Sequence, residues 1–241
     1  MPALVLLHAF PLDRSVWDRE VRALADVAAP IIAPSFAGFG RSELPRGQPT
    51  LDDYADAAIA IMDAAGVITA AVAGLSMGGY VAFAMWRRHR KRIERLALID
   101  TKAEGDTPEA AANRVRLAAT LREHGVEALL KTPPKWLRDG SPHWDALKAM
   151  IRAQNKEAVA QGSIAMSTRP DSRADLPTID VPAAVIVGEA DAITPVASSK
   201  TMADAIPGAT LAVIPDAGHI SNIEAPEAFE KAIRAWLRRP S

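Results

Sequence analysis

Six short apolar runs, unbroken by polar alternation, constrain the fold of this chain more than any other feature of its sequence. Each run is bounded by glycine, proline or a charged residue, and helical patterns such as residues 51–65 and 80–92 separate them. Strands without a polar face are buried on both sides, as in a parallel sheet whose crossover connections are helices. The alternation therefore predicts a doubly wound, mostly parallel α/β sheet. The strands are expected at residues 3–7, 31–33, 70–73, 96–99, 183–187 and 211–214.

One interval of the chain, from about residue 101 to residue 175, contains helical patterns and no convincing strand. A helical excursion between two strands indicates an inserted lid packed over the edge of the sheet. We therefore expect an α/β core of residues 1–100 and 176–241 and a helical lid of residues 101–175. The helices of the lid are expected at residues 108–124, 126–130, 144–154 and 156–168.

The composition excludes several classes of protein. The 241 residues include no cysteine, which excludes disulfides, thiolate catalysis and cysteine-bound metal. The histidines lack metal-ligand spacing, so no histidine-bound metal is expected. The formal net charge is −1, so nucleic acid is not an expected partner. The basic run at residues 87–92 falls at the end of a predicted helix, where the helix dipole favours cations.

The ends and the hydropathy of the chain bear on its location. No apolar run approaches the roughly 20 residues that cross a bilayer, so no membrane association is expected. The first residues lack the basic start and the cleavage site of a signal peptide, and a cytoplasmic location is therefore expected. The sequence leaves a monomer and a homo-oligomer equally open.

A strand–turn–helix context surrounds the candidate nucleophile. Residues 74–79 read Gly-Leu-Ser-Met-Gly-Gly, a G-x-S-x-G pattern between an apolar run and the helical pattern that begins at Tyr80. In such an elbow the serine takes a strained backbone conformation, and the glycines let strand and helix approach without Cβ clashes. Ser76 is therefore predicted to project above the carboxyl end of the sheet, at a helix N-terminus that stabilises negative charge.

A serine hydroxyl is a weak nucleophile and needs a base that a third group orients. Of the five histidines, His219 lies in a loop of small residues directly after the last predicted strand, where α/β sheets place reactive groups. Asp191 follows the preceding strand and lies between Ser76 and His219 in the chain, which gives the order nucleophile, acid, base. Glu189 and Asp100 are the alternative acids.

Acyl transfer also needs two backbone donors for the developing oxyanion. One is expected to be the N–H of Met77, directly after the nucleophile. The other is expected from the loop of residues 8–13, at the N–H of Phe10, which is retained because proline stands at position 11 instead. His8 is expected to shape this loop and not to act as a base.

These motifs together resemble the α/β-hydrolase superfamily along essentially the whole chain. Within the superfamily, the combination is similar to esterases and enol-lactone hydrolases, including 3-oxoadipate enol-lactonase. Relatives usually carry His-Gly where this chain has His8-Ala9, and they begin with an antiparallel hairpin for which Met1 leaves no room. A sheet of about six strands is therefore expected. The matching segments are residues 8–13, 38–42, 74–79, 188–191 and 217–224.

The resemblance implies two-step acyl transfer on a small ester or lactone, a reaction that requires neither a metal nor a cofactor. Perhydrolysis, hydrolysis of a carbon–carbon bond and a ligand-binding protein with a vestigial triad remain the alternatives. Arg169 and Lys135 could bind a substrate carboxylate, although a solvated surface position is expected for each. Ordinary packing is the more common role of apolar lid residues. The candidates for substrate contact are Asp100, Trp136, Trp144 and Met166.

Overall fold

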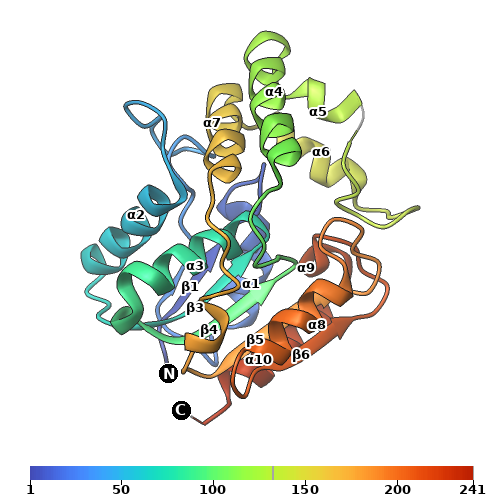
Figure 1. Ribbon diagram of the computed structural model, residues 1–241. Helices are drawn as coiled ribbons and strands as arrows, with labels where there is room; N and C mark the ends of the chain where they lie inside the picture. The colour runs from blue at the N-terminus through green and yellow to red at the C-terminus, as the bar shows by residue number, and fades with distance from the viewer. Residues whose placement is uncertain (132, 241) are drawn as a thin grey trace.

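One six-stranded sheet forms the centre of the protein (Figure 1). The computed structural model describes residues 1–131 and 133–240. The strands follow the order β2-β1-β3-β4-β5-β6, and every neighbouring pair is parallel. All six predicted strands are present, which confirms the doubly wound α/β class. Their bounds are β1 (Leu4–Leu7), β2 (Ile31–Ile32), β3 (Ala70–Leu75), β4 (Ile93–Ile99), β5 (Ala183–Gly188) and β6 (Thr210–Ile214).

The burial of the strands follows their sequence pattern. β1, β3 and β5 are buried along their whole length, as expected of strands with helices over both faces. β4 begins three residues earlier than predicted, because the buried Ile93 pairs with Ala70 across a register shift. Glu94 and Arg95 interrupt the apolar run there, and this interruption hid the start of the strand from the pattern.

The helices outside the insert surround this sheet (Figure 1). α3 begins directly after the predicted nucleophile and packs against β1, β3 and β4. α8 and α10 pack against β5 and β6. The amphipathic periods of these segments therefore correspond to crossover helices, as predicted. Their bounds are α1 (Asp18–Ala23), α2 (Leu51–Ala64), α3 (Met77–His89), α8 (Val196–Ala205), α9 (Ser221–Glu224) and α10 (Pro226–Leu237).

Among the described residues, four α-helices lie between β4 and β5 and form an insert at the top of Figure 1. The first and last residues of each of these helices lie within two residues of the predicted positions. The insert contacts the loops of the core: Gln154 Nε2 donates to Asp13 Oδ2 at 3.0 Å, and a Cβ at Gly162 would lie 2.8 Å from the ring of Phe39. The helices are α4 (Pro108–His124), α5 (Glu127–Lys131), α6 (Trp144–Arg152) and α7 (Lys156–Ser167).

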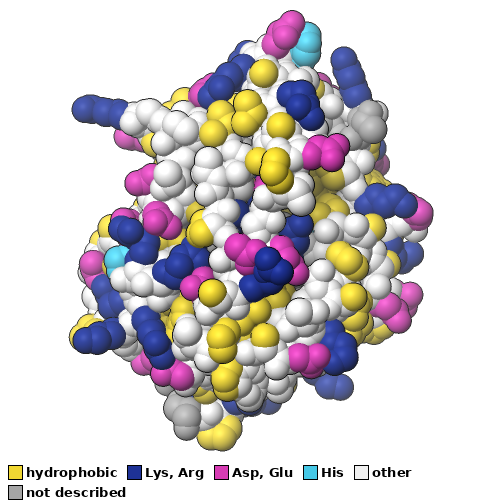
Figure 2. Space-filling model, in the orientation of Figure 1, with side chains coloured by type: hydrophobic (Ala, Val, Ile, Leu, Met, Phe, Trp, Pro, Cys, Tyr) yellow, Lys and Arg dark blue, Asp and Glu magenta, His cyan; other side chains and the backbone are white. Residues whose placement is uncertain are grey.

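The basic run at residues 87–92 ends α3, and its arginines pair with carboxylates of neighbouring segments. Basic and acidic side chains are interspersed in the same way over the face of the molecule that Figure 2 draws. The positive charge of the run is therefore compensated locally. The pairs are Arg87–Asp175, Arg88–Asp56, Arg90–Asp180 and Arg92–Asp63. Among the described residues, no helix is both long and apolar enough to cross a membrane.

Glu20 of α1 is a buried carboxyl group in the core, with 1% of its surface exposed. Burial raises the pKa of Glu20 to about 7, and the weak hydrogen bond from Asn222 Nδ2, at 3.4 Å, does not offset this effect. A carboxyl group whose pKa is raised by folding binds more protons in the native state than in the unfolded state. Its contribution to stability is therefore complete below the unfolded pKa and is lost as the pH rises through about 7.

We expect the variant Glu20→Gln to remove this pH dependence. Relative to the variant, the wild-type protein should lose on the order of 3 kcal/mol of unfolding free energy between pH 4 and pH 8. Thermal unfolding of both proteins across this range measures the difference, in which the other titrating groups cancel. Glu109→Gln, an exposed control in α4, should show no such trend. A constant difference between wild type and Glu20→Gln would contradict the assignment.

Candidate active site

The turn between β3 and α3 holds Ser76 in a strained conformation. Its backbone has φ 54° and ψ −110°, in a region that residues other than glycine rarely adopt. A Cβ at Gly74 would lie 2.3 Å from the carbonyl oxygen of Gly78, and one at Gly78 would lie 2.2 Å from that of Leu7. The glycines therefore permit the close approach of strand and helix that the G-x-S-x-G pattern predicts.

A continuous chain of hydrogen bonds links the three side chains that the sequence singles out. Ser76 Oγ lies 2.8 Å from His219 Nε2, and His219 Nδ1 lies 2.9 Å from Asp191 Oδ2. All three residues are at most 9% exposed. The serine follows β3, the acid follows β5 and the histidine follows β6, so the carboxyl ends of parallel strands bring the group together.

The acid is held by its own loop. Asp191 Oδ1 accepts hydrogen bonds from the backbone N–H groups of Ile193 and Thr194, both at 2.8 Å, and Oδ2 accepts one from Thr194 Oγ1 at 2.6 Å. Burial opposes ionisation, but the hydrogen bonds from His219 and Thr194 outweigh it and hold the pKa of Asp191 below its ordinary value. Sequence reasoning missed Thr194, although its place three residues after the acid suits such a contact.

The two alternative acids lie in other surroundings. Glu189 is exposed. Asp100 is fully buried at the end of β4, with φ 44°, and its carboxylate accepts hydrogen bonds from Gly188 N at 2.8 Å and Ser221 Oγ at 2.6 Å. Burial and the nearby Asp191 carboxylate raise the pKa of Asp100 to about 7. Asp100 therefore joins the end of β5, which precedes Asp191, to the start of α9, which follows His219, and both of its oxygens have protein partners.

The N–H groups of Phe10 and Met77 are the two predicted oxyanion donors. In the part of the chain that the structure describes, no hydrogen bond uses the N–H of Phe10 or of Met77. Met77 is the first residue of α3, where helical N–H groups have no intrahelical partner. His8 shapes the other loop: its Nδ1 donates to the Ala9 carbonyl at 3.0 Å, and its Nε2 accepts from Phe36 N at 3.0 Å. Burial lowers the pKa of His8 to about 4, so this ring is neutral.

The candidate substrate contacts in the insert lie in different places. Trp136 is buried, and its carbonyl oxygen accepts a hydrogen bond from Ile220 N at 3.0 Å, beside the histidine. Trp144 begins α6 and is partly buried. Met166 of α7 is buried, with its sulfur 3.5 Å from Arg114 Nη1. Trp136 is thus placed next to the loop of residues 215–220 between β6 and α9, here called the histidine loop. Met166, in contrast, packs between α7 and α4.

Arg169 does not lie solvated on the surface, so that expectation is wrong. Its Nη1 lies 2.7 Å from Asp106 Oδ1, and both side chains are 3% exposed. Its guanidinium lies over the ring of Tyr80, 4.2 Å from the centroid. Arg114 pairs with the same carboxylate, and the two cations hold the pKa of Asp106 below its ordinary value despite burial. Arg169 therefore links the two connections of the insert, whereas Lys135 is exposed.

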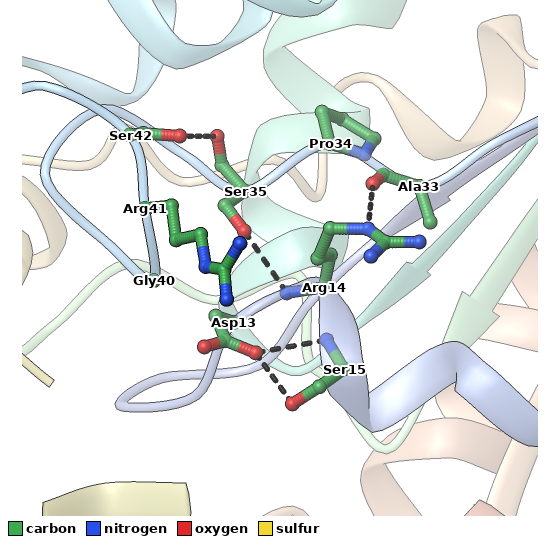
Figure 3. A pocket seen from close by; sticks show the side chains of 9 residues that line it. All are labelled: Asp13, Arg14, Ser15, Ala33, Pro34, Ser35, Gly40, Arg41 and Ser42. Atoms are coloured by element: carbon green, nitrogen blue, oxygen red, sulfur yellow. Dashed lines mark hydrogen bonds between the residues drawn. The ribbon is translucent and has the colours of Figure 1, made fainter. Parts of the chain in front are cut away.

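A surface cavity of about 570 Å³ lies beside the loop that carries Phe10 (Figure 3). Asp13 and Arg14 form one side and Gly40 and Arg41 another, and none of the three triad residues lines it. The Arg14 side chain is directed to the Ala33 carbonyl, to which its Nε donates at 3.3 Å. Among the described residues, no group of three His, Cys, Asp or Glu side chains is arranged to hold a metal ion.

The topology and the buried Ser–His–Asp arrangement define a member of the α/β-hydrolase class. The chain matches the alpha/beta hydrolase fold family over residues 2–226, and it belongs to that family. The resemblance to esterases and 3-oxoadipate enol-lactonases, expected from the motifs, is confirmed.

Three relatives illustrate this similarity. A thermophilic esterase from Thermogutta terrifontis is 38% identical, with a TM-score of 0.94 over 99% of this chain and 90% of that one. The enol-lactonase from Burkholderia xenovorans LB400 is 34% identical, with a TM-score of 0.88 over 99% of this chain and 92% of that one. The 3-oxoadipate enol-lactonase 2 of Acinetobacter baylyi is 27% identical over 99% of this chain and 89% of its own length.

Proposed function

We propose that this protein is a serine hydrolase that cleaves small carboxylic esters or lactones through an acyl-enzyme intermediate. The observation that carries the proposal is the unbroken hydrogen-bonded chain from Ser76 Oγ through His219 to Asp191. Ser76 also directly precedes α3, next to the N–H group of Met77, which has no protein partner among the described residues. The named relatives include an esterase and enol-lactonases, which supports the same reaction class.

In the first step Ser76 Oγ attacks the carbonyl carbon of the substrate. His219 Nε2 accepts the hydroxyl proton, because its other nitrogen donates to Asp191 and so leaves Nε2 as the acceptor. The N–H groups of Met77 and Phe10 stabilise the oxyanion. The imidazolium then protonates the leaving alcohol oxygen as the carbon–oxygen bond breaks, and the acyl group remains on Ser76.

In the second step water attacks the acyl-enzyme. His219 takes a proton from the water, the same two N–H groups hold the second oxyanion, and the proton passes to Ser76 Oγ as the carboxylic acid leaves. A lactone follows the same route, except that its leaving alcohol remains part of the acyl group, so that hydrolysis of the acyl-enzyme releases a single hydroxy acid. The insert covers the loops that carry the site and would set the size of the substrate.

A chain-length series of p-nitrophenyl esters at neutral pH tests this function. A γ-lactone is tested beside it, and its hydrolysis is monitored by the release of acid. Turnover of at least one of these substrates is expected, and the preferred chain length measures the size of the acyl pocket. Absence of turnover for every ester and for the lactone would overturn the proposal. It would favour carbon–carbon bond hydrolysis, perhydrolysis or a ligand-binding role.

A further inference from the structure

The backbone on both sides of His219 is held by one segment of the helical insert. Gly218 N donates to Glu224 Oε2 at 2.6 Å, and Arg138 N donates to the same oxygen at 3.1 Å. On the other side of the histidine, Ile220 N donates to the Trp136 carbonyl at 3.0 Å. Residues 136–138 of the insert are therefore hydrogen-bonded, directly or through Glu224, to both neighbours of the histidine.

The carboxylate at the centre of this contact is inaccessible to solvent. The Glu224 side chain is 1% exposed, and its second oxygen lies 3.9 Å from Arg138 Nε, within ion-pair range. There is also no spare room between the two segments, because a Cβ at Gly218 would lie 2.7 Å from Arg138 N and 2.9 Å from Glu224 Oε2. The insert and the histidine loop therefore form one tightly packed unit at this point.

A charged acceptor is suited to two converging donors. Hydrogen bonds to a carboxylate are shorter and stronger than those between neutral groups. Loss of the carboxylate would leave the N–H groups of Gly218 and Arg138 without their partner, and an unpaired buried donor is costly. The loop would then shift to find other partners and would carry His219 with it.

We propose that Glu224 is a positioning residue that ties residues 136–138 of the insert to the histidine loop and so holds His219 in line with Ser76. The proposal rests on the proposed function, since it assigns the histidine as the base. Asp191 fixes the rotation of the imidazole ring, whereas Glu224 and Trp136 fix the backbone from which the ring projects. The insert that covers the site thereby also sets the position of the base.

Three substitutions and one control test this role. Glu224→Ala removes the acceptor, Glu224→Gln keeps an oxygen of the same reach, and Glu224→Asp keeps the charge but shortens the side chain. Ser163→Ala is the matched control, because it removes one buried hydrogen bond inside the insert, from Ser163 Oγ to the Arg114 carbonyl at 3.0 Å, away from the histidine loop. Thermal unfolding is measured for every variant.

Two readouts separate positioning from a general loss of stability. Because a misplacement of about 1 Å can cost about a hundredfold in rate, Glu224→Ala is expected to lower kcat for p-nitrophenyl acetate at least tenfold with KM little changed. In Glu224→Ala, the low-field proton NMR signal of His219 Nδ1–H should also broaden or disappear. Glu224→Gln should restore kcat to within about threefold of wild type, and Ser163→Ala should retain both the rate and the signal.

The proposal is overturned if Glu224→Ala keeps the wild-type kcat and NMR signal. It is also overturned if Ser163→Ala, with the same change in Tm as Glu224→Ala, loses as much kcat and as much of the NMR signal as Glu224→Ala does. Should Glu224→Ala fail to fold, Glu224→Asp takes its place with the same expected losses. The NMR signal does not depend on turnover. A wild-type protein without esterase activity would therefore contradict the proposed function, while the effect of Glu224 on the signal would still decide the positioning role.

Discussion

Replacement of Ser76 by alanine is expected to abolish ester hydrolysis, with a decrease in kcat of roughly 10⁶-fold. The hydroxyl is the attacking group, and the side-chain contact that the variant loses is the one to His219 Nε2. The positive φ of Ser76 is retained by alanine at no greater cost than by serine, so folding should be unaffected. Rates for p-nitrophenyl acetate and thermal unfolding curves of the two proteins measure both effects.

Ser42→Ala is the matched control for this experiment. Ser42 is a partly buried loop serine, and its Oγ donates to the Ser35 carbonyl at 3.0 Å, not to a triad residue. Its kcat should stay within about twofold of wild type, as for surface substitutions in general. Residual turnover in Ser76→Ala above a few per cent, with purity established, would require another nucleophile and would contradict the mechanism.

The variant Asp191→Asn is expected to lower kcat by about 10⁴-fold while leaving the fold intact. The structure determines how the new amide would lie. Two backbone N–H groups point at Oδ1, so the amide oxygen must occupy that position and the NH₂ group must face His219 Nδ1. The imidazole would then carry its proton on Nε2, where it cannot accept the proton of Ser76. Single-turnover acylation rates measure this defect directly.

The corresponding amide substitution at Glu189 distinguishes between Glu189 and Asp191, the two acids of this loop. Glu189 is exposed and two residues away from Asp191, so Glu189→Gln should change kcat by less than twofold. Asp100 is not expected to substitute for the missing acid, because its oxygens accept hydrogen bonds from Gly188 and Ser221. A larger loss in Glu189→Gln than in Asp191→Asn would reverse the assignment of the acid.

The strands and the elbow could be predicted because their causes are local. A strand buried on both faces needs an unbroken apolar run, and the runs at residues 70–73 and 183–187 lie within the observed β3 and β5. The glycines around Ser76 mark the same place, since only they allow strand and helix to approach so closely. β4 began earlier than predicted where polar side chains interrupted the apolar run.

The sequence by itself determined the fold class and the position of the insert, and it singled out the three side chains that the structure joins by hydrogen bonds. Only the tertiary structure decided which carboxylates face which partners. Asp191 and Asp100 both follow strands of the same sheet, and only the direction of each side chain separates them. Arg169 was expected to be solvated, yet its partner Asp106 lies 63 residues away in the chain, and Glu224 accepts a hydrogen bond from Arg138 N, 86 residues away. Such contacts leave no periodic signal, because they depend on how distant loops converge after the sheet has formed.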